Sequence, residues 1–169
     1  VALSGQDCNR CIRDAILNTS KRTGFRGRWE KLSDTPLTIC DIGHNEHGLR
    51  HNFAQLSQMK EQGKCTDLII VYGSVADKDV DASIHLMPEN AHYIFTCATG
   101  KRALPAEIAR DKYLSFCASA GREPGDVRCC GTVPEAVHEA FAIAAAFRES
   151  DPSAKPLIYV GGSTYVVSE

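Results

Sequence analysis

Five short apolar runs recur along the chain, each rich in Val, Ile, Tyr or Cys. They are LTIC (37–40), LIIVYG (68–73), HYIFTCA (92–98), DVRCCG (126–131) and LIYVGG (157–162). Each has the length of a strand, and none shows the strict alternation of a strand with one face in water. Continuous apolar strands of this kind are typical of a parallel sheet that is buried on both faces.

Segments with helical periodicity separate these runs. One apolar stripe follows the first run and another follows the fourth: Leu49, Phe53, Leu56 and Met59, then Val133, Val137, Phe141 and Ala144. The segment PAEIARDKYLSFCASAG follows the third run, with Pro105 suited to a first turn and Gly121 to a C-terminal stop. Strands that alternate with helices predict an α/β fold, a Rossmann-like three-layer sandwich with a mostly parallel sheet of five to six strands.

The region before residue 30 has a different pattern. It predicts a helix from Asp7 to Asn18, followed by the basic loop KRTGFRGR. The chain starts with VALSGQDCNRCIRD, which has neither an initial Met nor the apolar core of a signal peptide. We therefore expect a chain cut from a longer protein, with residues 1–22 as a helix and linker to a missing upstream domain.

Composition narrows the function classes. With 19 basic and 21 acidic residues in 169, the charge balance does not favour nucleic acid as the main ligand. No window approaches 18 consecutive apolar residues, so no membrane-spanning segment is expected. Five of the eight cysteines (Cys40, Cys65, Cys97, Cys129 and Cys130) lie in or beside apolar runs, as reduced thiols do, which predicts a cytoplasmic setting.

Parallel sheets bind ligands at the carboxyl ends of their strands. The stretches that follow the five runs are DIGHN, SVADKD, TGKRA, GTVPE and GGSTY. In the first stretch, Asp41 is either a helix-start device or an acceptor for ligand hydroxyls, and position alone leaves both open. His44 lies in the loop after the strand, where Asn45 can cap the next helix.

The other histidines and the cysteine pair do not favour a metal site. His47 and His51 share one helix face, but it lies opposite the apolar stripe and would point to solvent. Cys8 and Cys11 form a lone CxxC with no second pair at zinc-ribbon spacing. We therefore expect no bound metal, and a zinc-binding module stays only as an alternative.

No complete phosphate-binding loop is present. FTCATGKRA lacks the first Gly and the final Ser or Thr of a P-loop, and no GxGxxG occurs. Arg28 and Arg102 are loop guanidiniums that could grip phosphate oxygens. Lys78 lies between two carboxylates in a stretch that could equally be a charged turn. Ser163 stands beside two glycines that would let a backbone approach a ligand.

The order of these stretches is more specific than any one of them. The series GRWE, CDIGHN, VYGSVADKD, FTCATGKRA and GGSTYVV resembles the C-terminal domain of the folylpolyglutamate synthase/dihydrofolate synthase family, within the Mur ligase superfamily. The resemblance runs from about residue 23 to the end, so residues 23–169 would form that domain. One departure is Glu46, which stands where the family often has Pro, and a Glu near a helix start is favourable to the helix dipole.

The resemblance implies a reaction and a set of residue roles. In the family, ATP converts a folate or pteroate carboxylate to an acyl phosphate, and the amine of L-glutamate then attacks it. By position, ATP would be bound by Arg28 and Asp41, and glutamate by His44, Ser163 and Tyr165. Asn45, Lys78 and Arg102 would line the cleft.

The family's P-loop, most Mg²⁺ ligands and most of the folate pocket belong to an N-terminal domain whose motifs are absent from these residues. We therefore expect this chain alone to be inactive and to bind ATP weakly if at all. Two further alternatives stay open: a Mur-type ligase acting on a cell-wall precursor, and a nucleotide-binding module without catalysis.

Overall fold

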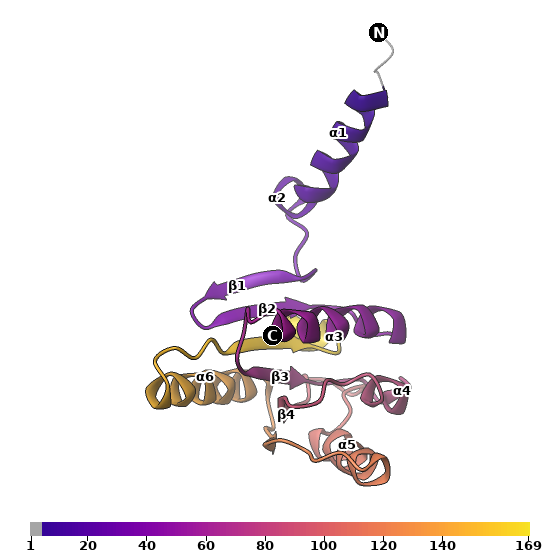
Figure 1. Ribbon diagram of the computed structural model, residues 1–169. Helices are drawn as coiled ribbons and strands as arrows, with labels where there is room; N and C mark the ends of the chain where they lie inside the picture. Colours follow the sequence, from indigo (N-terminus) through magenta and orange to yellow (C-terminus); the bar gives the residue numbers. More distant parts are fainter. Residues whose placement is uncertain (1–4) are drawn as a thin grey trace.

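A computed structural model of the chain describes residues 5–169 and contains one six-stranded sheet (Figure 1). The strand order is β1-β2-β6-β3-β4-β5. The strands are β1 (Glu30–Asp34), β2 (Leu37–Asp41), β3 (Leu68–Tyr72), β4 (His92–Phe95), β5 (Val127–Cys129) and β6 (Leu157–Gly161). The last five correspond to the five apolar runs and pair with one another in parallel, so the predicted fold class is confirmed.

Strand β1 was not located by the apolar pattern. It pairs with β2 in an antiparallel hairpin, with Glu30 opposite Cys40. Its sequence is EKLSD, and none of its residues is fully buried. A polar edge strand of this kind carries no continuous apolar run because only one of its edges is paired and much of its surface faces water.

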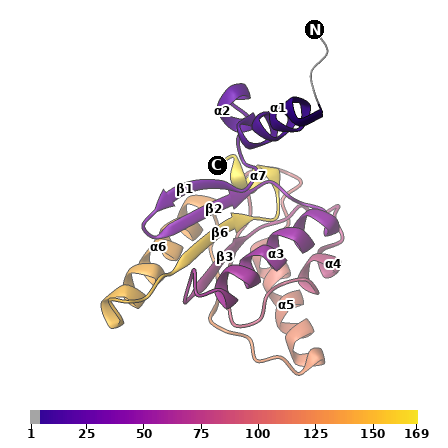
Figure 2. The ribbon, with the colours of Figure 1, turned by 45° about the horizontal axis from the view of Figure 1, so that its top comes forward.

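Two layers of helices cover the sheet (Figure 2). On one face lie α3 (Glu46–Glu61), α4 (Val80–Ile84) and α5 (Ala106–Ala120). On the other lie α6 (Val133–Ser150) and α7 (Thr164–Val167). Alternate residues of each buried strand enter the two clusters, as in β3, where Ile70 packs with the first and Ile69 with the second. The result is the three-layer sandwich that the alternating pattern predicts.

The apolar stripes are partly confirmed. In α3, Leu49, Phe53 and Leu56 are buried and Met59 packs against them. In α6 the buried face is instead Val133, Ala136, Ala140, Ile143 and Ala144, whereas Phe141 is 37% exposed. The predicted α6 stripe was therefore wrong at Phe141 and only partly right at Val137. Small alanines let the helix lie close to the sheet, so the larger apolar residues of α6 do not mark its buried face. In α5, Gly121 is the left-handed C-cap, and Pro105 is the N-cap rather than a first-turn residue.

The N-terminal segment extends away from the sheet as α1 (Gly5–Leu17) and α2 (Thr19–Thr23) (Figures 1 and 2). The expected helix is confirmed, but the start of the expected basic loop is helical. Ile12, Ile16 and Leu17 are exposed on α1. Within residues 5–169, no helix is long and apolar enough to cross a membrane.

Candidate functional site at the carboxyl rim of the sheet

The strand register places the predicted site stretches along one edge. Asp41 is level with Gly161, Gly161 with Tyr72, and Tyr72 with Phe95. The loops after these four strands and after β5 therefore meet at the carboxyl ends of the strands. We call this edge, together with the segment 25–29 described next, the carboxyl rim.

Arg28 reaches the same rim because β1 runs antiparallel to β2. The backbone N–H of Trp29 donates to the Asp41 carboxylate over 2.7 Å, and the N–H of Ile42 donates to the Gly27 carbonyl over 2.8 Å. The Arg28 side chain is exposed and makes no ion pair within residues 5–169. Arg28, Asp41, His44 and Ser163, which are far apart in sequence, are thus gathered on one edge of the fold.

Asp41 is the most enclosed charged group of the rim, with 6% of its surface exposed. Its Oδ1 accepts from the N–H of Gly43 over 2.6 Å and from the side-chain amide of Asn52 over 2.8 Å. Its Oδ2 accepts from Trp29. The structure therefore favours an internal, backbone-organising role for this carboxylate, which position alone had left open. A contact from Asp41 to ribose hydroxyls would have to be made in addition to these three bonds.

His44 and Asn45 differ in what they can offer a ligand. His44 is exposed, with its Nδ1 3.0 Å from the Ile42 carbonyl oxygen. Asn45 accepts from the N–H of Gly48 over 2.8 Å and is the N-cap of α3, as its position suggested. His47 and His51 are exposed on α3.

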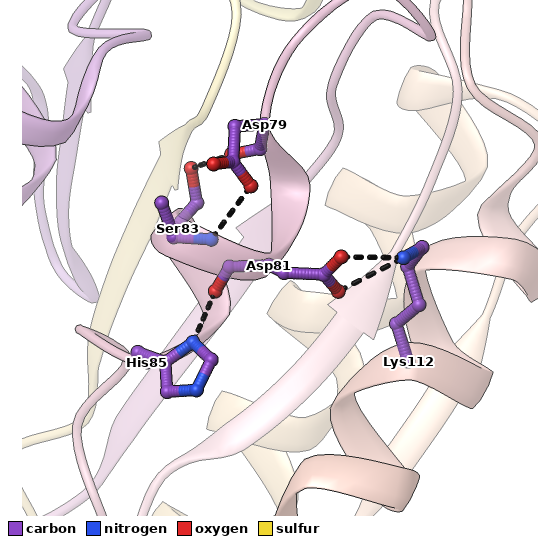
Figure 3. Close-up of polar contacts among 6 residues, drawn as sticks. Asp79, Asp81, Ser83, His85 and Lys112 are labelled. Carbon is purple, nitrogen blue, oxygen red and sulfur yellow. Dashed lines mark hydrogen bonds and ion pairs between the residues drawn. The ribbon is translucent and has the colours of Figure 1, made fainter.

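The DKD stretch forms a charged turn. Asp79 is the N-cap of α4, accepting from the N–H of Ala82 over 3.0 Å, and Asp81 on α4 pairs with Lys112 of α5 (Figure 3). Asp77 pairs with Arg102 across the β3 and β4 loops, and this guanidinium lowers the pKa of the Asp77 carboxyl. Lys78 is exposed and makes no ion pair with any described residue.

Ser163 and Tyr165 follow β6. Ser163 is 3% exposed, and its hydroxyl accepts from the N–H of Tyr165 over 3.2 Å as the N-cap of α7. Tyr165 is 48% exposed and lines a cavity of about 130 Å³ with Lys101 and Arg102 of the β4 loop. Of the two, Tyr165 is accessible in this conformation, whereas Ser163 is buried.

Sequence reasoning missed several residues of the rim. Asn52 is buried and links Asp41 to the Tyr159 hydroxyl, which its amide reaches over 3.0 Å. Asn52 follows Leu49 by three positions, so a polar residue on an apolar helix face was the available signal. Glu169 was also missed: its carboxylate accepts from the N–H of Thr99 over 2.5 Å. No sequence pattern marked that long-range contact.

The described residues do not form a metal site: no group of three His, Cys, Asp or Glu side chains within them is placed to hold an ion. The cysteines of this part of the chain are all free thiols. Burial raises the pKa of the Cys40 thiol to about 11, so at neutral pH it behaves as a small apolar core residue. The chemistry of the rim therefore lies in its cations, His44 and backbone N–H groups.

The chain is similar in sequence to proteins of a known family. Residues 27–151 match the family model described as Mur ligase, glutamate ligase domain. Dihydrofolate synthase/folylpolyglutamate synthase of Buchnera aphidicola is 33% identical over 90 residues, which are 52% of this chain and 20% of that protein. A probable bifunctional folylpolyglutamate synthase/dihydropteroate synthase of Haloferax volcanii is 28% identical over 158 residues, 92% of this chain and 16% of that protein.

Solved structures show the same fold. Folylpolyglutamate synthase of Mycobacterium tuberculosis, complexed with ADP and AMPPCP, aligns with a TM-score of 0.67 at 23% identity, over 85% of this chain and 30% of that one. The bifunctional folylpolyglutamate synthase/dihydrofolate synthase of Yersinia pestis, with AMPPNP and Mn, gives 0.66 at 21% identity, over 99% and 34%. The matched part of the chain thus covers between 16% and 34% of the length of these similar proteins.

Proposed function

Because the chain belongs to the Mur ligase, glutamate ligase domain family, we propose that it is the C-terminal domain of an ATP-dependent ligase that adds L-glutamate to dihydropteroate or folate. The reaction passes through an acyl phosphate and yields an amide, ADP and phosphate. The folate branch is favoured by the two similar sequences, both of which are named as folylpolyglutamate synthases.

The observation that carries the proposal is the meeting of the GRW and DIGHN stretches at one rim through Asp41. The carboxylate binds the N–H of Trp29 and the N–H of Gly43, and these residues directly neighbour Arg28 and His44. An exposed guanidinium and an exposed imidazole are thereby presented from the same edge of the sheet. This is the edge at which parallel α/β sheets take their ligands.

Arg28 is the group that reaches the ATP phosphates. Negative charge on phosphoryl oxygens shifts as the acyl phosphate forms, and a cation placed beforehand stabilises that charge. Arg28 has no competing carboxylate among the described residues, so its guanidinium is available. Asp41 contributes to ATP binding chiefly by holding the backbone of Arg28 in place, with any direct ribose contact as an additional role.

Glutamate binds at the same rim, beside His44 and Tyr165. Its carboxylates need donors, and the phenol of Tyr165 can supply one. His44 can donate from Nε2 as an imidazolium, because its Nδ1–H faces the Ile42 carbonyl. Lys78 and Arg102 add positive charge from the neighbouring loops. Ser163 takes part through the turn that positions Tyr165, because Ser163 is buried and its hydroxyl caps α7. Asn45 shapes the rim as the cap of α3.

The remaining parts of the active site come from a P-loop domain outside these residues. Mg²⁺ neutralises phosphate charge in such ligases, but the described residues offer no cluster that would hold it. We assign its ligands to the partner domain, together with most of the folate pocket. The two domains close to bring the amine of glutamate to the acyl carbon and exclude water, in the cytoplasm where folate and ATP are available.

The test is a glutamate-ligation assay on the full-length protein that carries this chain. We expect ATP-dependent incorporation of labelled L-glutamate with dihydropteroate or a reduced folate, and none from residues 1–169 alone. Arg28→Ala should lower kcat/KM for ATP by about 100-fold, as removal of a charge-stabilising donor does, whereas Arg50→Ala, at an exposed ion pair on α3, should not. Ligation only with a cell-wall precursor would replace the folate assignment, and no ligation with either would overturn the proposal.

A further inference from the structure

At the buried end of the rim, Asp41 belongs to a polar network with Asn52 and Tyr159, two residues to which the proposed function assigns no role. The chain of contacts runs from the Tyr159 hydroxyl through the Asn52 amide to the Asp41 carboxylate, with steps of 3.0 and 2.8 Å. Tyr159 is fully buried and Asn52 is 4% exposed. Burial, and next the nearby charge of Asp41, raise the pKa of Tyr159, so its phenol stays neutral.

The network continues from Asp41 to two backbone segments. Oδ1 also binds the N–H of Gly43, and Oδ2 binds the N–H of Trp29. Trp29 has φ of 43°, in the left-handed region, which a bulky residue adopts only when its surroundings impose it. Its ring lies 6.2 Å from that of Tyr159, centroid to centroid. The backbone that carries Arg28 is therefore held in a strained form by this network.

The fit around Asp41 is close. A Cβ added at Gly43 would lie 2.8 Å from Asp41 Oδ1 and 2.9 Å from Asn52 Nδ2, closer than real Cβ contacts. Only glycine at position 43 lets its N–H and the Asn52 amide reach the same oxygen. Because both donors converge on Oδ1, they leave Oδ2 to Trp29 and so set the rotation of the carboxylate.

We propose that Asn52 is a positioning residue of the ATP-binding rim, acting through Asp41 to fix the backbone at Trp29 and Gly43 without touching substrate. The expected effect of Asn52 on ATP binding rests on the proposed function. The structural part of the proposal concerns this chain alone. When Asn52 cannot donate, the carboxylate rotates more freely, and the positions of Arg28 and His44 are less well defined.

The first experiment measures amide hydrogen exchange in residues 1–169 carrying Asn52→Leu, which has similar volume and no donor. The amides of Trp29 and Gly43 should exchange about ten-fold faster than in the wild-type chain, after correction for global unfolding measured on α6 amides. Gln55→Leu, one turn further along α3, is the control, because the side chain of Gln55 makes no hydrogen bond with the described residues. Increases at Trp29 and Gly43 no larger than those in α6 would overturn the proposal.

The second experiment uses the full-length enzyme. Asn52→Leu should raise KM for ATP about ten-fold and change kcat by less than about three-fold, since binding is disturbed and the reacting groups remain. An unchanged KM in a folded variant would overturn the catalytic part. If Asn52→Leu does not fold, Tyr159→Phe is tested in its place, because it keeps the ring and removes only the hydroxyl that accepts from Asn52. The faster amide exchange and the higher KM for ATP should then both appear in weaker form. Absence of both effects would overturn the proposal. Absence of ligation by the wild-type enzyme would instead count against the proposed function and leave the exchange result intact.

Discussion

At the β2 end of the carboxyl rim, Asp41 is buried and three protein donors bind its carboxylate. At the β3–β4 end, by contrast, Asp77 is exposed and forms an ion pair with Arg102. The first arrangement fixes a strained backbone, because a buried carboxylate is costly unless every lone pair that faces the protein is matched. In the second arrangement both charged side chains are exposed to water, so the ion pair can be broken at little cost in free energy. A ligand anion can therefore recruit Arg102 from Asp77, but a ligand cannot displace Trp29 or Gly43 from Asp41 without disturbing the fold.

Removing the buried carboxylate tests this contrast most severely. Asp41→Ala leaves the N–H groups of Trp29 and Gly43 and the Asn52 amide without their acceptor, and Trp29 without the bond that maintains its positive φ. We expect the free energy of unfolding to fall by about 3 kcal/mol, measured by urea denaturation. Asp77→Ala is the matched control and should leave the denaturation midpoint where it is. Equal effects of the two substitutions would contradict the distinction between the two ends.

Adding a single methyl group beside Asp41 is a milder disturbance. Gly43→Ala places a Cβ within 2.8 Å of the carboxylate oxygen, so Asp41 or Asn52 must move. Overpacking of this kind should cost about 2 kcal/mol in the free energy of unfolding, by the same measurement. Gly131→Ala, whose added Cβ would meet nothing closer than 3.6 Å, serves as the control on the other side of the rim. A neutral Gly43→Ala would show that the network tolerates rearrangement.

The ion pair of Asp77 and Arg102 at the exposed end of the rim should be sensitive to pH rather than to changes in side-chain packing. The side-chain hydrogen bond and charge of Arg102 lower the pKa of Asp77, so this pair stabilises the fold above the ordinary carboxyl pKa and is lost as pH falls through the lowered value. Arg102→Met should return the Asp77 pKa to its ordinary range, which NMR titration of the side-chain carboxyl carbon would detect. Because both side chains are more than half exposed, the contribution of the pair is small, and the denaturation midpoint at pH 7 should fall only slightly. A large loss of stability at pH 7 would mean that this pair is structural as well.

The sequence was most informative where one kind of side chain dominated a whole segment. Strands β2, β3, β4 and β6 were predicted from their apolar runs and α3 from its stripe, because burial on both faces of a sheet favours apolar residues. The edge strand β5 is only partly buried, and its run was recognised although it contains Arg128. The caps at Asn45 and Asp79 were also open to prediction, since they depend on neighbours within three residues. The order of the loop motifs along the chain was enough to indicate the family.

Other features were not visible without the fold. Strand β1 is polar, and its place is decided by pairing with β2. The inner face of α6 consists mainly of alanines, so the larger Phe141 was wrongly predicted to lie on the buried face of the helix. The burial of Ser163 likewise depends on how closely the turn after β6 packs against β3, where a Cβ added at Gly162 would lie 2.5 Å from the Gly73 carbonyl oxygen.

Residue types and their order thus determined the class of fold, the edge of the sheet that carries the motifs and the family. Tertiary structure alone decided which of those motif residues face solvent and which form hydrogen bonds within the rim. The reason is that Asp41 is bonded to Trp29 and Asn52, and Asn52 to Tyr159, and these three bonds join residues 11 to 107 positions apart in the sequence. Local pattern reports the neighbours of a residue along the chain, whereas the availability of a carboxylate depends on its neighbours in space.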